Sequence, residues 1–226
     1  EVVELRARAN EVRRRLQKAF PKPECELSHE NAWQLLIATI LSAQSTDKLV
    51  NSVTPKLFAR FGDAAALAQA DPDDVEALVR PTGFFRNKAK AIIGASQALM
   101  DRHRGEVPRT MKALTALPGV ARKTANVVLG VAYRIPTGMV VDTHAGRVAR
   151  RLELSSETDP VKVEDDLCGL FHKRSWIDMS HRLVLHGRYV CRKQKPDCAA
   201  CPLFEICPQR ESDRAEGRWT QRAQAE

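Results

Sequence analysis

Residues 117–129 read Leu-Pro-Gly-Val-Ala-Arg-Lys-Thr-Ala-Asn-Val-Val-Leu, and they are the most informative segment of the sequence. It predicts a short helix that enters, a sharp turn at Pro118-Gly119-Val120-Ala121, and an amphipathic helix that leaves from about Arg122. Backbone amides at the start of such a helix have no partner inside it and point outward, which favours an anion such as one phosphate. A Pro-Gly turn between helices is also a common connector, so neighbouring motifs have to decide between the two interpretations.

The segments on either side also have helical patterns. Apolar residues recur at steps of three and four in the N-terminal segment, and residues 32–43 are apolar almost all round, which is typical of a buried helix. Period-two alternation is absent over any useful length, so we predict an all-α fold. Caps and breakers such as Thr46, Asp71-Pro72, Gly105 and Thr110 set the ends of the expected helices, which are 5–19, 32–43, 46–61, 71–80, 86–104 and 110–117.

The chain is basic and does not resemble a membrane protein. It has 226 residues, with 36 Lys plus Arg and 28 Asp plus Glu, which gives a formal net charge of +8. Its 43% hydrophobic and 28% charged residues are ordinary globular composition, which excludes a disordered chain. The longest apolar stretches, 35–41 and 127–132, are far shorter than the roughly 18 residues that a membrane span needs. We therefore expect a polyanion as the leading partner and no membrane association.

Lys123 and Asp142 are the candidate reactive residues. A helix from Lys123 to about Arg134 is roughly 20 Å long, and Pro136 stops it. The chain from Pro136 to Asp142 can return roughly 20 Å if extended, so the two side chains can face each other across one cleft. Both also have ordinary interpretations, because Lys123 can be a solvated first-turn lysine and Asp142 can cap the helix that follows it.

Four cysteines fall within a short C-terminal segment, with the spacing Cys191-x6-Cys198-x2-Cys201-x5-Cys207. Clustering of this kind, in a chain that shows no secretion signal, favours a bound metal in a reducing compartment over disulfides. Tetrahedral zinc and a [4Fe-4S] cluster are both compatible with four thiolates, and the spacing alone does not separate them.

The sequence at 117–125, Val-Asp-Thr-His at 141–144 and the cysteine cluster together resemble the endonuclease III family of DNA glycosylases, over about residues 5–210. The resemblance implies a helix-hairpin-helix DNA glycosylase fold, with two helical lobes flanking a DNA-binding cleft and a [4Fe-4S] cluster on the four cysteines. It also implies excision of oxidised pyrimidines, such as thymine glycol, from duplex DNA. Cleavage of the abasic site by β-elimination then follows.

By position, the resemblance implies that Lys123 is the catalytic nucleophile and Asp142 the catalytic aspartate. Departure of a base builds positive charge at C1′ of the deoxyribose, which a nearby carboxylate stabilises. An amine that attacks C1′ forms an iminium, and this electron sink allows β-elimination of the 3′ phosphate. A lysine amine is protonated at neutral pH. Burial and the positive end of a helix would lower the pKa of such an amine, whereas a close carboxylate would raise it, and our hypothesis is that Asp142 accepts or relays the proton.

The resemblance also implies a set of DNA contacts. Gln44 stands where the family inserts a polar side chain into the hole left by a flipped base. Phe84 stands in the wedge against the partner base, where leucine is common, with Arg86 and Lys88 beside it. Ala121 replaces a second hairpin glycine, and a left-handed backbone there would cost about 1 kcal/mol. The other expected contacts are Gly119, Val120, Ala121, Arg122, His144, Arg192, Lys193 and Lys195.

Two alternatives remain open. One is a monofunctional mismatch glycosylase of the same superfamily, although that branch has a glutamate where Ile40 stands and lacks the nucleophilic lysine. The other is a non-catalytic DNA-binding module. We expect a monomer that binds double-stranded DNA with a damaged base or abasic site, in the cytoplasm with the nucleoid and with no targeting segment. The expected parts are a six-helix lobe at 25–135 with the hairpin, a cluster lobe at 1–24 and 136–211, and a disordered tail at 212–226.

Overall fold

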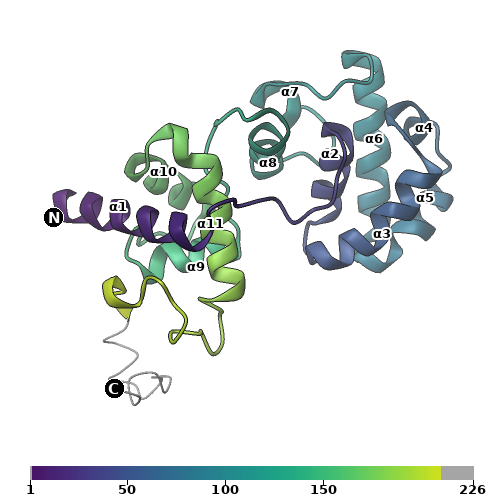
Figure 1. Ribbon diagram of the computed structural model, residues 1–226. Helices are drawn as coiled ribbons and strands as arrows, with labels where there is room; N and C mark the ends of the chain where they lie inside the picture. The colour runs from purple at the N-terminus through teal and green to yellow at the C-terminus, as the bar shows by residue number, and fades with distance from the viewer. Residues whose placement is uncertain (1, 210–226) are drawn as a thin grey trace. The chain divides into compact units, whose positions relative to one another are not determined.

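The computed structural model describes residues 2–209, and those residues form helices and loops with no strand (Figure 1). The all-α prediction is therefore confirmed for this part of the chain. No helix in it is long and apolar enough to cross a membrane. The chain divides into two compact units: residues 25–137, which we call the hairpin unit, and residues 1–24 with 138–226, which we call the cysteine unit. The tail expected at 212–226 lies outside the described residues.

The hairpin unit contains seven α-helices, where six were expected. The additional helix is short: Asp63 accepts a hydrogen bond from the amide of Ala66 and so begins a helix of only five residues, α4. Thr46, Asp71 and Thr110 each cap a helix, as predicted. The helices are α2 (Ala32–Leu41), α3 (Asp47–Arg60), α4 (Ala64–Ala68), α5 (Pro72–Val79), α6 (Phe85–His103), α7 (Met111–Thr115) and α8 (Arg122–Tyr133), with a 3₁₀ turn η1 (Arg80–Thr82) before α6.

Helix α2 is the centre of the hairpin unit. Every one of its residues after Ala32 is buried, and it packs against α3, α6 and α8 (Figure 1). The indole of Trp33 donates a hydrogen bond to Ser96 Oγ of α6 at 3.3 Å, so the polar atom of this buried ring has a partner. The helix ends at Leu41, two residues before the predicted end, and the loop that follows turns left-handed at Gln44.

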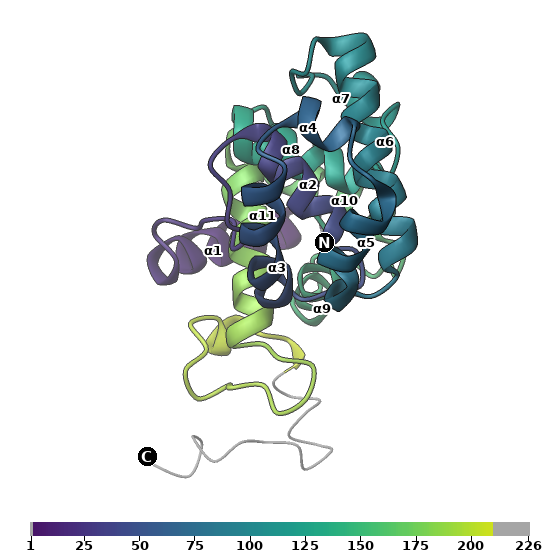
Figure 2. The ribbon, with the colours of Figure 1, turned by 90° about the vertical axis from the view of Figure 1, so that its right-hand side faces the viewer.

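The cysteine unit is built around α11. This helix packs against α9 and α1, and the loop that carries the cysteines follows it (Figure 2). Gly187 permits the approach of α9, because a Cβ there would lie 2.9 Å from the carbonyl oxygen of His144. The elements are α1 (Val2–Ala19), α9 (Thr143–Arg151), α10 (Pro160–Leu170), η2 (Lys173–Ser175), α11 (Trp176–Tyr189) and η3 (Phe204–Ile206).

The border between the units falls after Thr137, two residues beyond the expected end of the lobe. The Thr137 hydroxyl donates a hydrogen bond to Asn126 Oδ1 of α8 at 2.7 Å. This bond ties the start of the connecting segment to the hairpin unit.

The segment that leads to Asp142 is held by Ser180 of α11. The buried Ser180 hydroxyl accepts a hydrogen bond from the Val140 amide at 2.9 Å and donates one to the carbonyl oxygen of Trp176 at 2.7 Å. We predict that Ser180→Ala lowers the free energy of unfolding by about 1 to 3 kcal/mol, because the Val140 amide loses its acceptor. Urea denaturation measures the change. The matched control is Ser52→Ala at an exposed position of α3, for which we expect less than about 0.5 kcal/mol.

Candidate functional site

The hairpin between α7 and α8 turns at Gly119. The Val120 amide donates to the carbonyl oxygen of Leu117 at 3.2 Å, and Gly119 has a φ of 73°, as a type II turn with proline in its second position requires. A Cβ at Gly119 would lie 2.8 Å from Ala91 Cβ of α6 and 3.4 Å from Ile40 Cγ2 of α2. Only glycine therefore satisfies both the backbone angle and the space at this position.

The strain expected at Ala121 is absent. Ala121 has a φ of −87° and a ψ of 172°, which is extended backbone that alanine adopts without cost, because the turn places its left-handed residue at Gly119 alone. The expected role of Val120 also changes. Its amide already donates within the turn and its side chain is buried, so it shapes the turn rather than offering its amide to an anion.

The start of α8 is suited to an anion. No side chain caps its N-terminus, whereas α2, α3, α5 and α9 each begin with a capping Asn, Thr or Asp. The first amides of a helix have no partner within it and carry the positive end of the helix dipole. This uncapped end, directly after the turn, matches the phosphate site predicted from the sequence.

Lys123 lies in the first turn of α8 and is exposed, as is Arg122 beside it. The fold of the hairpin unit therefore does not bury Lys123. The apolar side of α8 faces the core through residues such as Ala125 and Leu129, both fully buried, so the register of the helix turns Lys123 away from the core. Its amine is accessible to a reactant that approaches the hairpin.

Asp142 is the N-cap of α9, the ordinary interpretation of this residue. Its Oδ1 accepts hydrogen bonds from the amides of His144 and Ala145, each at 2.8 Å. Its Oδ2 accepts no hydrogen bond from the described residues. The cap thus fixes the carboxylate and leaves one oxygen for another task, so the structural and the chemical interpretation are compatible.

Arg147 braces the start of α9. Its Nη2 lies 3.3 Å from His144 Nδ1 and donates to the carbonyl oxygen of Gly187 at 2.6 Å, while its Nε donates to the carbonyl oxygen of Cys191 at 3.1 Å. Burial lowers the pKa of this guanidinium from its ordinary value, but these contacts satisfy it. His144 is consequently held in the turn that carries Asp142. The position of Arg147 in the sequence did not reveal these contacts.

Gln44 and Phe84 share an unusual backbone. Both are exposed and both lie in the left-handed region, with φ values of 52° and 47°. The side chain of Phe84 is 64% exposed, whereas Phe85 packs against the core and lies under the guanidinium of Arg80 at 4.9 Å. Strained conformations of this kind cost about 1 to 3 kcal/mol and are concentrated at functional sites. The two residues expected to enter the duplex are therefore both presented by strained loops.

Lys88 does not belong to the expected basic track. It is only 5% exposed, and its Nζ donates to the carbonyl oxygen of Thr82 at 2.7 Å. Burial lowers its pKa from the ordinary lysine value. Through this hydrogen bond Lys88 holds the loop that carries Phe84, whereas Arg86 is exposed.

The four cysteines lie in one neighbourhood after α11. Burial raises the pKa of Cys201 to about 12; a backbone hydrogen bond from Leu203 opposes this shift, and the thiols of Cys191, Cys207 and Cys198 add to it. Fully buried Leu203 anchors the loop in the core of the unit. A thiol of this kind ionises only against a strong positive charge such as a bound metal. Among the described residues, no three His, Cys, Asp or Glu side chains form a site for a single metal ion.

Two residues near the thiols were not singled out by the sequence. The buried ring of His186 has its Nε2 3.7 Å from Cys201 Sγ, and burial lowers its pKa to about 4, so the ring is neutral at pH 7. Arg151 of α9 donates to Cys191 Sγ at 3.2 Å. No sequence signal identified them, because both come from helices outside the cysteine motif. The exposed cations Arg192, Lys193 and Lys195 lie on the first part of the loop.

Comparisons with known proteins agree with this geometry. Residues 37–173 match the family described as HhH-GPD superfamily base excision DNA repair protein. The chain is 49% identical to the Endonuclease III of Synechocystis sp., over 89% of this chain and 92% of that protein. It is similar to a non-covalent Endonuclease III-DNA complex, with a TM-score of 0.84, 40% identity and coverage of 88% of this chain and 94% of that one. It is also similar to a trapped Endonuclease III-DNA covalent intermediate, with a TM-score of 0.85, 40% identity and coverage of 91% and 98%.

The turn at Gly119 yields a direct prediction. Gly119→Ala forces a side chain into the left-handed region and against Ala91, so we expect the free energy of unfolding to fall by about 1 to 2 kcal/mol or more. Gly62→Ala is the control, because a Cβ at Gly62 meets nothing within 4 Å and its φ is not left-handed. Equal stabilities of the two variants in thermal and urea unfolding would contradict the assigned turn.

Proposed function

Because the chain belongs to the endonuclease III family, whose members are bifunctional DNA glycosylases and AP lyases within the HhH-GPD superfamily, we propose that Lys123 and Asp142 perform its chemistry at one deoxyribose of damaged duplex DNA. We also propose oxidised pyrimidines, such as thymine glycol, as its substrates, and a monomer as its active form. The observation that carries the proposal is the exposed amine of Lys123 in the first, uncapped turn of α8.

The chemistry has two steps. As the bond between the base and C1′ breaks, the Lys123 amine forms a bond to C1′, and the base leaves with the electron pair of the broken bond. Opening of the sugar ring converts this adduct into an iminium. Loss of a 2′ proton then drives electrons toward the iminium and expels the 3′ phosphate by β-elimination. Lysine rather than water is required for the second step, because only an amine forms the iminium.

Asp142 is proposed to stabilise the cationic sugar and to accept the proton of the attacking amine. Its cap bonds occupy Oδ1 and restrict rotation of the carboxylate, so Oδ2 is left available to the reactant without reorganisation. The uncapped amides at the start of α8 are proposed to bind a phosphate next to the lesion, with Gly119, Ala121 and Arg122 as the donors. Gln44 is proposed to fill the space that the flipped base leaves, and Phe84 is proposed to stack on the unpaired partner base.

A [4Fe-4S] cluster is proposed for Cys191, Cys198, Cys201 and Cys207. Four thiols with a shared electrostatic neighbourhood form the donor set that iron-sulfur clusters use. When bound, the cluster supplies a rigid anchor for a loop with little regular structure of its own. That loop would then present Arg192, Lys193 and Lys195 to phosphates.

Ile40 disfavours the mismatch-glycosylase alternative. It occupies the position where that branch has a glutamate, and here it is 4% exposed and packs under the hairpin turn. An apolar, buried side chain supplies neither a proton nor a negative charge. The chain therefore lacks the acidic group of that branch at this position. The experiment that tests Lys123 also tests the non-catalytic alternative.

We predict that borohydride traps a covalent adduct between the wild-type protein and abasic DNA, and that Lys123→Ala abolishes it. Borohydride reduces the iminium to a stable amine, which denaturing gel electrophoresis detects. Lys112→Ala, an exposed lysine of α7, is the matched control and should form the adduct at the wild-type rate. Failure of the wild-type protein to form any adduct would overturn the lyase assignment and leave the monofunctional glycosylase and the non-catalytic module as the remaining alternatives.

Asp142→Asn separates the cap from the charge. The amide oxygen of asparagine still caps α9, so we expect stability close to wild type, whereas base excision should slow by about 10²-fold or more because the negative charge is lost. Asp142→Ala should additionally lose about 1 kcal/mol of stability with the cap. Single-turnover excision and thermal unfolding measure the two effects. Wild-type excision by Asp142→Asn would remove this residue from the mechanism.

The exposed cations at the hairpin, wedge and cysteine loop predict a salt-dependent affinity. If about five of them meet phosphates, the logarithm of the binding constant should fall against the logarithm of the salt concentration with a slope of about −4 to −5. Fluorescence anisotropy with an abasic-analogue duplex measures the slope. A flat dependence would contradict a track of phosphate contacts.

A further inference from the structure

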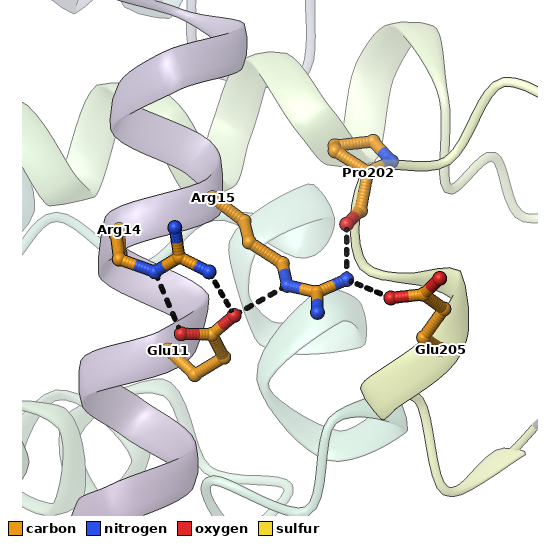
Figure 3. A network of polar contacts seen from close by, with 5 residues as sticks. All are labelled: Glu11, Arg14, Arg15, Pro202 and Glu205. Carbon is orange, nitrogen blue, oxygen red and sulfur yellow. Dashed lines mark hydrogen bonds and ion pairs between the residues drawn. The ribbon is translucent and has the colours of Figure 1, made fainter.

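Two arginines from outside the cysteine loop hold it at opposite ends. Arg15 of α1 holds the second half: its Nη1 donates to the carbonyl oxygen of Pro202 at 3.2 Å and to Glu205 Oε2 at 2.9 Å (Figure 3). Glu11 accepts from its Nε at 2.6 Å and also pairs with Arg14, which fixes the direction of the guanidinium (Figure 3). Arg15 therefore contacts only oxygen atoms of the loop.

Arg151 of α9 holds the first half and also contacts sulfur. Its Nη1 donates to Cys191 Sγ at 3.2 Å and to the carbonyl oxygen of Arg192 at 2.9 Å, and its Nη2 donates to the carbonyl oxygen of Lys193 at 3.3 Å. Its own carbonyl oxygen accepts from Cys207 Sγ at 3.9 Å. One partly buried residue thus contacts the first and the last cysteine of the motif.

We propose that Arg151 is a positioning residue for the [4Fe-4S] cluster, which holds Cys191 in its ligand position and raises the reduction potential of the cluster. This inference rests on the cluster assigned under the proposed function. A cation next to a ligating sulfur stabilises the state with more negative charge, which is the reduced state, and hydrogen bonds to the sulfurs are a known means of setting potentials. The same bonds fix the thiolate in space, as outer-sphere partners of metal ligands do.

Arg151, Arg15 and Arg150 allow a matched experiment, in which each is changed to glutamine in the holoprotein. Arg151→Gln should lose iron to a chelator on the order of 10- to 100-fold faster than wild type and should have a lower midpoint potential. Arg15→Gln should lose iron faster with an unchanged potential, because Arg15 touches no sulfur. Arg150→Gln should change neither, because Arg150 is exposed and its guanidinium donates to the carbonyl oxygen of Glu157, which lies outside the cysteine loop. Loss of visible absorbance follows iron release, and protein voltammetry measures the potential.

A wild-type potential in Arg151→Gln would overturn the proposal, as would equal potential shifts in all three variants. If Arg151→Gln does not fold with iron, Arg151→Lys decides: a single ammonium cannot reach the sulfur and both carbonyl oxygens, so iron loss faster than wild type is expected, and a wild-type rate overturns the proposal. Zinc in place of iron in the wild-type protein overturns both the cluster and the role of Arg151. Iron without a borohydride adduct overturns only the lyase activity.

Discussion

The contact between the Gly119 backbone and helices α2 and α6 is the constraint on which the candidate site depends. Ala91 and Ile40 lie so close to Gly119 that no side chain fits there, and the left-handed turn places the start of α8 directly beyond it. Since Ala121 at the N-cap has no side chain that can accept a hydrogen bond, no side chain caps α8, and its amides and Lys123 are presented together. The same contact buries Ile40, so the position that another branch uses for an acid serves here as packing.

Asp142 shows how one carboxylate combines structure and chemistry. Capping α9 uses only Oδ1, and the segment before it is tied to α11 through Ser180. Arg147 connects the first turn of α9 to the carbonyl oxygens of Gly187 and Cys191. The carboxylate that we propose for the reaction thus lies on a helix end that both sets of contacts hold in place, which limits its reorganisation.

The cysteine loop obtains its order from outside itself. Apart from the short 3₁₀ turn η3, the segment after α11 has little regular structure, and its backbone is held by Arg15, Arg151 and the buried side chain of Leu203. Each arginine donates to carbonyl oxygens that would otherwise lack partners in a loop. Because the proposed cluster requires four thiolates at defined positions, these external bonds would limit how far the loop can spread before a cluster binds.

Helix positions, helix caps and short motifs could be predicted from the sequence alone, because they depend on residues that are close together in the chain. Helix periodicity and the capping residues Thr46, Asp71, Thr110 and Asp142 predicted an all-α chain and most helix starts, because these signals act over one or two turns. The short helix α4 was missed, since five residues carry too little periodicity to register. The cysteine spacing alone predicted a metal site, and the family resemblance singled out Lys123 as the candidate nucleophile, because both signals are short motifs in the sequence.

Burial and hydrogen-bond partners became known from the tertiary structure, because they depend on residues that are distant in the sequence. Lys88 and Lys123 are both lysines near a helix start, yet one is buried against Thr82 and the other exposed. Arg151 and Cys191, which are in contact, are 40 residues apart in the sequence, and no local pattern predicts their contact. Burial and hydrogen-bond partners are properties of packed surfaces, so the sequence determines which residue types are available and packing determines which of them meet.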